Sequence, residues 1–283
     1  MGTAIGRRYV LIDPIGYGGL CVVYRAIDTL CGMCIALKML TAGLADRPGV
    51  RERVYREALI TDRLRGPSVP RVYDFGETRL PDRTVVPYVS MELLAGTPLA
   101  SRLATGPLPW PEAVRVAGTV ADALALAHRH GVVHRDLRPE NIMMTGSGPK
   151  LIDFGEATIV DPVRGSLHPA EDVYGLGVLL YRMLTAGPAH RPGRPAATPV
   201  LPVAGMPRSL AEICRACMEK RPALRPGSAE VATALWDIGL DEPARARRHG
   251  VGPAGRHWAA GLNVRPYVLA AGARSTPCSM AFC

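Results

Sequence analysis

The chain has few aromatic residues and no long apolar run. Aromatic side chains make up only 5% of the 283 residues, whereas hydrophobic residues of all kinds make up 48%, so aliphatic side chains must fill most of the core. No stretch approaches the roughly 20 apolar residues that a membrane-spanning helix requires. No apolar segment precedes the first strand-like stretch, as a signal peptide would. We therefore expect no membrane span and a cytoplasmic location.

Acidic residues are missing from the last forty positions. From Ala244 onward the chain has six arginines but no lysine and no acid, so six of the nine net positive charges lie in this segment. The preceding residues carry only about +3 (9 − 6), which gives no reason to expect binding to nucleic acid. We predict that residues 241–283 form a basic tail, rich in Arg, Gly and Pro, that is disordered.

The seven cysteines include two C-x-x-C pairs, Cys31 with Cys34 and Cys214 with Cys217. Two such pairs could form a tetrahedral zinc site. However, Cys214 and Cys217 lie in a helical pattern, where a spacing of three puts both on one buried face. Cys31 and Cys34 flank a Gly-Met turn. We favour reduced cysteines without a metal.

The spacing of apolar residues predicts a strand-rich first part and a helical second part. Strand-like segments cover residues 9–15, 21–26, 34–40, 69–75 and 84–92, and a charged helix covers residues 50–65. Helical periodicity starts at Pro111-Glu112 and recurs over residues 172–184, 208–219 and 228–238. The fold class predicted from this order is α+β.

The strongest functional signal is a pair of polar runs in the helical part. The run from His134 to Asn141, His-Arg-Asp-Leu-Arg-Pro-Glu-Asn, is followed twelve positions later by Asp153-Phe154-Gly155. Phosphoryl transfer from ATP requires one group that orients the attacking hydroxyl and others that hold magnesium on the phosphates. Asp136 and Asn141, together with Asp153 on a neighbouring turn, are residue types that suit this chemistry.

Two features of the strand-rich part fit the same chemistry. A Gly-rich hairpin from Ile15 to Val23 lies between the first two strands, where glycines let backbone amides approach phosphates. Such a hairpin is often only a turn, and a dinucleotide-binding turn would need a helix after the glycines, whereas a strand follows here. Lys38 ends the next strand. We expect Glu57 on the following helix to orient it, with Glu52 as the competing choice.

These motifs, in this order, resemble those of the eukaryotic-like (Hanks-type) protein kinases over roughly residues 9–240. The form Ile-Gly-x-Gly-Gly looks most like the bacterial serine/threonine kinases. The resemblance implies a bilobal fold, with a small antiparallel β-sheet N-lobe that carries one helix and a larger, mainly helical C-lobe. It places the kinase domain at residues 1–240, with the N-lobe at 1–92, the hinge at 92–96 and the C-lobe at 97–240.

The resemblance also implies a role for each motif residue. Asp136 would be the catalytic base, Arg138 would stabilise the γ-phosphate, and Lys38 would contact the α- and β-phosphates. Asn141 and Asp153 would hold Mg²⁺, with Mn²⁺ as the alternative. The remaining ATP contacts would come from Ile15, Gly16, Tyr17, Gly18, Gly19, Leu20, Cys21 (where a third glycine is usual), Val22, Val23, Ala36, Glu57, Met91, Glu92, Leu94 and Met143.

One segment departs from the family pattern. Asp172, which resembles the residue that anchors the catalytic loop, follows Asp153 by only nineteen positions, and no good Ala-Pro-Glu motif lies between them. Most of the activation and peptide-docking segment is therefore expected to be missing. Arg225 would lose its usual glutamate partner, so we expect it to be exposed or to recruit Glu171.

Three functions remain compatible with the sequence. The first is a serine/threonine protein kinase that uses Mg-ATP and acts on a protein hydroxyl. The second is an ATP-binding pseudokinase that serves as a regulator or scaffold, because the docking segment is short. The third, less favoured, is a small-molecule kinase. The substrate, the upstream signal and the oligomeric state have no sequence signal.

Overall fold

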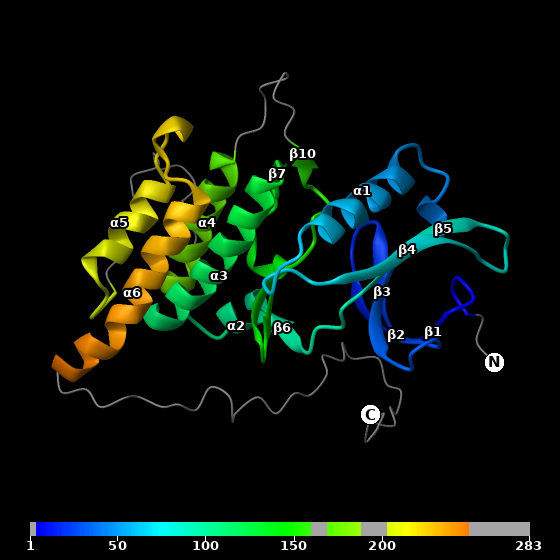
Figure 1. Cartoon of the computed structure of the whole chain (residues 1–283), viewed down its shortest axis with the longest axis horizontal. Coiled ribbons are helices and arrows are strands. Elements are labelled where there is room, and N and C mark those ends of the chain that lie inside the picture. The colour runs from blue at the N-terminus through cyan, green and yellow to red at the C-terminus, as the bar shows by residue number, and fades with distance from the viewer. Residues whose placement is uncertain (1–3, 160–168, 188–202, 249–283) are drawn as a thin grey trace.

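The computed structural model describes residues 4–159, 169–187 and 203–248, and it arranges them in two lobes (Figure 1). A strand-rich lobe contains the first part of the chain, and a helical lobe contains the second. The predicted α+β class and the bilobal arrangement are therefore confirmed. The predicted tail falls mostly on residues 249–283, which lie outside the described residues.

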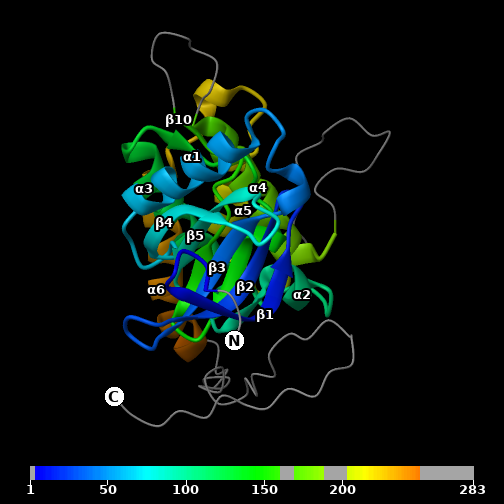
Figure 2. The same cartoon turned by 90° about the vertical axis from the view of Figure 1, so that its right-hand side faces the viewer.

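The small lobe is built on a five-stranded antiparallel sheet, shown toward the viewer in Figure 2. Its strands have the order β1-β2-β3-β5-β4. Helix α1 packs against β4 and β5 through the buried side chains of Val54 and Ala58, whereas its buried Ile60 belongs to the hydrophobic core of the large lobe. The bounds are β1 Tyr9–Tyr17, β2 Cys21–Asp28, β3 Cys34–Leu40, α1 Val50–Arg63, β4 Val72–Arg79 and β5 Val85–Met91, with a short 3₁₀ helix at Ala42–Leu44.

Strand β4 begins later than predicted. The sequence pattern placed it at residues 69–75, whereas the structure places it at Val72–Arg79. Val69 instead closes a turn, because its N–H donates to the carbonyl of Gly66. Pro70 has no N–H to contribute to a strand ladder. The prediction was therefore wrong by three residues at the start of this strand.

The large lobe is a helical core with small strands on the side of the small lobe. Helix α3 buries most of its surface and packs along α6, where Gly118 allows the Trp236 ring to approach: a Cβ there would lie 3.0 Å from Trp236 Cε2. The helices are α2 Leu99–Leu103, α3 Trp110–Arg129, α4 Ala170–Thr185, α5 Arg208–Cys217 and α6 Ser228–Arg248. The strands are β6 Gly96–Pro98, β7 Val132–Val133, β8 Ile142–Thr145, β9 Gly148–Leu151 and β10 Thr158–Ile159, and 3₁₀ helices cover Pro139–Asn141 and Pro222–Leu224.

Helix α6 extends beyond its predicted end. The apolar periodicity ended at Ile238, but the helical backbone continues to Arg248, past the domain boundary predicted at residue 240. Apolar periodicity reports only the part of a helix that faces a core. The extension includes Gly239 and Pro243, which have low helix propensity, so backbone propensity does not explain it.

The two cysteine pairs lie in different lobes. Cys214 and Cys217 are buried on α5, whereas Cys31 and Cys34 are exposed in the β2–β3 hairpin. Within residues 4–159, 169–187 and 203–248, no group of three or more His, Cys, Asp or Glu side chains is placed to hold a metal ion by itself. None of the helices in these ranges is both long and apolar enough to cross a bilayer.

Candidate active site

Strand register brings the predicted phosphate-binding residues of the small lobe into one row. Gly16 of β1 lies opposite Val23 of β2, and Val23 lies opposite Lys38 of β3. Two positions before Lys38, Ala36 lies opposite Met91 of β5. Since alternate residues of a strand share a face, Ala36 and Lys38 project from the same side of the sheet.

Lys38 is held between two carboxylates. Its Nζ lies 2.5 Å from Glu57 Oε1 and 3.3 Å from Asp153 Oδ1. Burial alone would lower the pKa of Lys38, but Glu57 and Asp153 outweigh this effect and raise it above the ordinary value. The ammonium group is therefore charged and fixed. The structure brings Glu57 to this position, whereas Glu52 lies on the exposed face of α1.

The β8–β9 hairpin brings the two predicted metal-holding residues together. At its open end Ile142 pairs with Leu151, and the N–H of Ile152 donates to the carbonyl oxygen of Asn141 at 2.8 Å. Asn141 and Asp153 therefore lie just beyond the two ends of one hairpin. This geometry explains why two motifs twelve residues apart meet in space.

The donor set at Asn141 and Asp153 fits a divalent cation. A carboxylate and an amide oxygen are the hard ligands that Mg²⁺ prefers. Burial would raise the pKa of Asp153, but the Lys38 ammonium and the N–H of Gly155 lower it below its ordinary value, so the carboxylate is charged. Asn141 binds Asp136 through its amide nitrogen, which leaves its amide oxygen as a donor for a cation.

The carboxylate of Asp136 is fixed by its own loop. Asn141 Nδ2 donates to Asp136 Oδ2 at 2.8 Å and to the Asp136 carbonyl oxygen at 2.9 Å. The Asp136 N–H in turn donates to His134 Nδ1 at 3.3 Å. A carboxylate held in this way can receive a proton from a hydroxyl without first reorganising.

Asp172 at the start of α4 shapes this catalytic loop. Its Oδ1 accepts the N–H of Arg135 and its Oδ2 accepts the N–H of His134, each at 2.8 Å. Arg135 has φ +70° and Asp153 has φ +64°, in the left-handed region that side chains other than glycine rarely adopt. The Asp172 carboxylate, only 1% exposed, holds the first of these strained residues in place.

Two supporting residues, His128 and Ser228, were not anticipated from the sequence. His128 of α3 makes two contacts: its Nε2 lies 2.8 Å from Asp172 Oδ2 of α4, and its Nδ1 lies 2.8 Å from Ser228 Oγ of α6. His128 therefore connects three helices. The His134 ring packs edge-on against Phe154, with ring centroids 4.7 Å apart. His128 was not anticipated, because nothing in a local pattern distinguishes it from its neighbour His130.

The hinge is braced by a lysine that the sequence reasoning missed. Glu92, the first residue after β5, accepts a hydrogen bond from Lys150 Nζ at 2.9 Å and from the N–H of Arg71 at 3.2 Å. The Lys150 side chain is 10% exposed. The only sequence signal was a lysine in the otherwise apolar strand that leads to Asp153. Leu94 follows in the same hinge segment, and Met143 lies on β8 opposite Pro98.

The Gly-rich hairpin connects β1 to β2 and remains open to a ligand. It carries the other predicted contacts, with Ile15, Gly16 and Tyr17 at the end of β1, Gly18 to Leu20 in the turn, and Cys21 to Val23 in β2. The Gly18 N–H donates to the Cys21 carbonyl oxygen at 2.8 Å. A Cβ on Gly19 would meet nothing within 4 Å, so packing alone does not require glycine there. Burial raises the pKa of the Cys21 thiol to about 11.

Two arginines have partners that differ from those of the family pattern. Arg138 Nε donates to Glu140 Oε2 at 3.0 Å, and both side chains are about half exposed. Arg225 donates to the carbonyl oxygens of Glu219 at 2.7 Å and Ala170 at 2.8 Å, and its guanidinium stacks on the Tyr174 ring. Arg225 is therefore half-buried and, within the described residues, forms no ion pair with Glu171 or any other acid.

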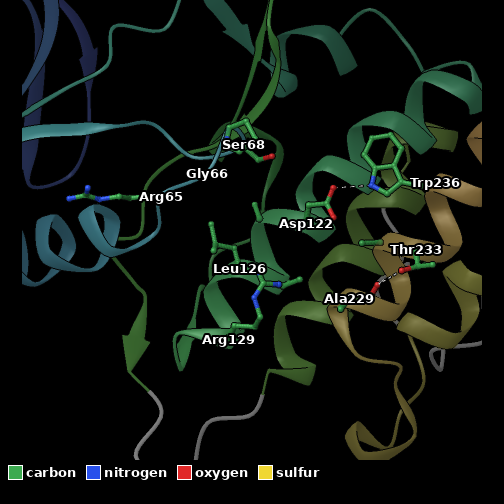
Figure 3. Close-up of a pocket in the computed structure, with 13 residues that line it drawn as sticks. Arg65, Gly66, Ser68, Asp122, Leu126, Arg129, Ala229, Thr233 and Trp236 are labelled. Carbon is green, nitrogen blue, oxygen red and sulfur yellow. Dashed lines mark hydrogen bonds between the residues drawn. The ribbon is translucent and has the colours of Figure 1, made fainter.

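A separate cavity of about 450 Å³ lies between the loop at residues 66–68, α3 and α6 (Figure 3). The Trp236 indole N–H donates to Asp122 Oδ2 at 2.9 Å at one side, and Arg129 lies at another. None of the residues lining this cavity is a predicted site residue. The candidate active site is therefore the place where Lys38 and Glu57 of the small lobe meet Asp153 of the large lobe, called the cleft from here on, and not this cavity.

Comparison with known proteins gives the same family. A family model described as the protein kinase domain matches residues 9–166, more than half of the chain. The serine/threonine-protein kinase PknA of Mycobacterium tuberculosis (strain ATCC 25618 / H37Rv) is 33% identical over 260 residues, which cover 80% of this chain and 59% of PknA. The probable serine/threonine-protein kinase PknB of Corynebacterium glutamicum is 36% identical over 213 residues, covering 66% of this chain and 33% of PknB.

The serine/threonine-protein kinase PknB of Mycobacterium leprae is 34% identical over 208 residues. The chain spans about a third of the length of these PknB proteins and 59% of PknA. All three relatives are bacterial, as the form of the Gly-rich loop indicated, and the family uses ATP with a divalent metal. From the motifs, the bilobal fold and the family match together, the chain belongs to the protein kinase family.

Proposed function

We propose that this chain is a serine/threonine protein kinase that transfers the γ-phosphoryl group of ATP to a protein hydroxyl. The observation that carries the proposal is the charged cluster of Lys38, Glu57 and Asp153. The β8–β9 hairpin connects Asp153 to Asn141, which in turn fixes the carboxylate of Asp136 by a hydrogen bond. The names of the bacterial relatives, all serine/threonine-protein kinases, support the choice of substrate class.

Each residue of the cleft then has a defined task. The Lys38 ammonium binds the α- and β-phosphates. Glu57 orients this ammonium group, so that it does not pair with Asp153 alone. Asp136 orients the substrate hydroxyl and accepts its proton as the oxygen attacks the γ-phosphorus, while the bond from that phosphorus to the β–γ bridging oxygen breaks and ADP leaves. Mg²⁺, with Mn²⁺ as the alternative, would be held by Asn141 and Asp153 and would neutralise negative charge on the phosphates.

Arg138 must change partner if it is to assist. Its guanidinium contacts Glu140, and an exposed pair of this kind contributes only about 0–1 kcal/mol. A γ-phosphate carries more charge than a carboxylate, so it competes well for the same guanidinium. We propose that Arg138 exchanges Glu140 for the γ-phosphate when ATP is bound.

The proposal extends to the rest of the chain. Residues 1–92 would form the ATP-binding N-lobe, 92–96 the hinge that binds adenine through its backbone, and 97–240 the substrate-binding lobe. Ile15, Val23, Ala36, Met91, Leu94 and Met143 would enclose the base. The protein would act in the cytoplasm on a protein substrate.

Transfer from radiolabelled ATP to the protein itself or to a general protein substrate tests this function. Asp136→Ala is expected to abolish transfer, whereas binding of a fluorescent ATP analogue stays within about twofold of wild type, because Asp136 is not expected to bind the nucleotide. Asp62→Asn, a carboxylate at the end of α1 outside the cleft, is the matched control. Transfer that persists in the Asp136 variant would exclude the proposed role of Asp136.

A nucleotide-binding pseudokinase is the second candidate. The Arg138–Glu140 pair and the short interval between Asp153 and Asp172 favour it. Purified wild-type protein that binds the ATP analogue but transfers no phosphate to any protein, with either Mg²⁺ or Mn²⁺, would support this reading over the first.

A further inference from the structure

Helix α1 makes a direct contact with the metal-binding turn that the roles above do not use. Arg53 Nε donates to the carbonyl oxygen of Gly155 at 3.1 Å. Its Nη2 forms an ion pair with Glu156 Oε1. One guanidinium therefore binds both the backbone and a side chain of the two residues that follow Asp153-Phe154.

Arg53 and Glu57 act from consecutive turns of α1. Residues four positions apart on a helix are neighbours on one face, so both side chains point to the cleft side. Glu57 reaches Lys38, which in turn contacts Asp153. The helix is thus attached to residues 153–156 through two successive turns.

The turn itself is packed closely against α1. A Cβ on Gly155 would lie 3.0 Å from Asp153 Oδ1 and 3.4 Å from Glu57 Oε2. Any rigid movement of α1 away from the turn would therefore carry Glu57 away from Asp153. It would also weaken the ion pair between Glu57 and Lys38. The contact of Arg53 with Gly155 opposes this movement.

The other ion pair of this part of α1 cannot fix the helix to the turn. Arg51 pairs with Glu77 of β4, which belongs to the small lobe. That pair attaches α1 to its own sheet. Within the described residues, the ion pair that crosses from α1 to the turn after Asp153 is Arg53 with Glu156.

We propose that Arg53 is a positioning residue that fixes α1 where Glu57 can orient Lys38, with the Glu156 carboxylate as its permanent anionic partner. In protein kinases the position of this helix is commonly controlled by a phosphate added to the activation segment. In this chain the anion is the carboxylate of Glu156, which is part of the amino-acid sequence and is not added by phosphorylation. Among the described residues, the guanidinium of Arg135, the other arginine at this segment, donates to the neutral Thr158 hydroxyl at 3.3 Å and forms no ion pair.

Hydrogen exchange of the α1 amides, residues 50–63, tests the proposal without nucleotide or activity. Arg53→Met is expected to speed exchange in this helix about 5- to 10-fold and Glu156→Gln up to about 5-fold, because both variants lose a partly exposed ion pair and Arg53→Met also loses a half-buried hydrogen bond. Arg56→Met is the matched control, since Arg56 is an exposed arginine on the same helix with no described partner. Equal exchange in the Arg53 and Arg56 variants would overturn the proposal.

A charge exchange separates positioning from general stability. In the double variant Arg53→Glu with Glu156→Arg, the hydrogen-exchange rate of the α1 amides is expected to return toward the wild-type rate, whereas in Arg53→Glu alone it is faster. A rate in the double variant that stays as fast as in Arg53→Glu would contradict pairing of the two side chains as the cause. Phosphatase treatment of the wild-type protein is expected to leave α1 exchange unchanged, and faster exchange after treatment would show that the controlling anion is a phosphate.

The kinetic consequence rests on the proposed function. If wild type transfers phosphate, kcat/KM for ATP is expected to fall about 10-fold in Arg53→Met and to recover in the charge-exchange variant. Unchanged kcat/KM in Arg53→Met would refute the link to Lys38. A wild-type protein without transfer, but with the exchange pattern above, would refute the kinase function and leave the role of Arg53 in place.

Discussion

Replacement of Asp172 by alanine is expected to damage the stability of the large lobe severely. The Asp172 carboxylate accepts the backbone N–H groups of His134 and Arg135 and lies 2.8 Å from His128 Nε2. The residue is 1% exposed, so water cannot replace these bonds without entering the core. Each buried N–H left without an acceptor costs about 1–3 kcal/mol. Two such groups amount to about 2–6 kcal/mol, a large part of the roughly 5–15 kcal/mol that holds a domain together.

Urea unfolding followed by circular dichroism measures this loss. Asp172→Asn keeps the size and one carbonyl oxygen, so it is expected to lose about half as much free energy of unfolding as Asp172→Ala. Asp122→Ala removes an exposed carboxylate that accepts one bond from Trp236 and is expected to cost less than about 1 kcal/mol. A loss below about 1 kcal/mol in Asp172→Ala, or equal losses in both Asp172 variants, would show that the two amides do not carry the effect.

Three further predictions concern packing, acid stability and thiol reactivity. Gly96→Ala places a Cβ against the backbone carbonyl of Met144 and is expected to cost about 1–3 kcal/mol; an unchanged urea midpoint would contradict it. Hydrogen bonding to Arg8 lowers the pKa of Asp28 to about 2, so the stability that Asp28 adds is complete above about pH 4 and is lost as the pH falls through 2. The difference in stability between wild type and Asp28→Asn should shrink over that interval, and a constant difference would refute the assignment. In the native protein a thiol reagent should modify the exposed Cys31 and Cys34 and spare the buried Cys21, Cys214 and Cys217, for which burial raises the pKa to about 11 or 12; peptide mass mapping that finds the reverse order would disprove this.

The sequence predicted those features that depend on local pattern. The strand pairs around the Gly-rich hairpin and the long apolar helix α3 follow from spacing along one or two elements, whereas the choice of Glu57 over Glu52 rested on the family resemblance. The family motifs supplied the site residues, and the structure brings Lys38, Glu57 and Asp153 within contact of one another. Their roles toward ATP and metal stay predictions that the experiments above test.

The features that escaped prediction depend on contacts between distant parts of the chain. Arg53 is one of three arginines in the first two turns of α1, and nothing local distinguishes it from Arg51 or Arg56. Its partners Gly155 and Glu156 lie 102 and 103 positions later. Lys150 and Glu92 are likewise 58 positions apart. A periodic pattern carries no information about such pairs, because it shows which face of a helix is buried but not which distant residues lie against that helix.

The hold of Asp172 on the catalytic loop has a consequence for the order in which the chain is made. The amides of His134 and Arg135 precede their acceptor by 38 and 37 positions. A ribosome therefore releases the whole catalytic run well before the residue that bends it into shape. The family match ends at residue 166, before Asp172 is reached. A fragment cut at that point would contain Lys38, Asp136, Asn141 and Asp153, yet its catalytic loop would have no buried acceptor to shape it.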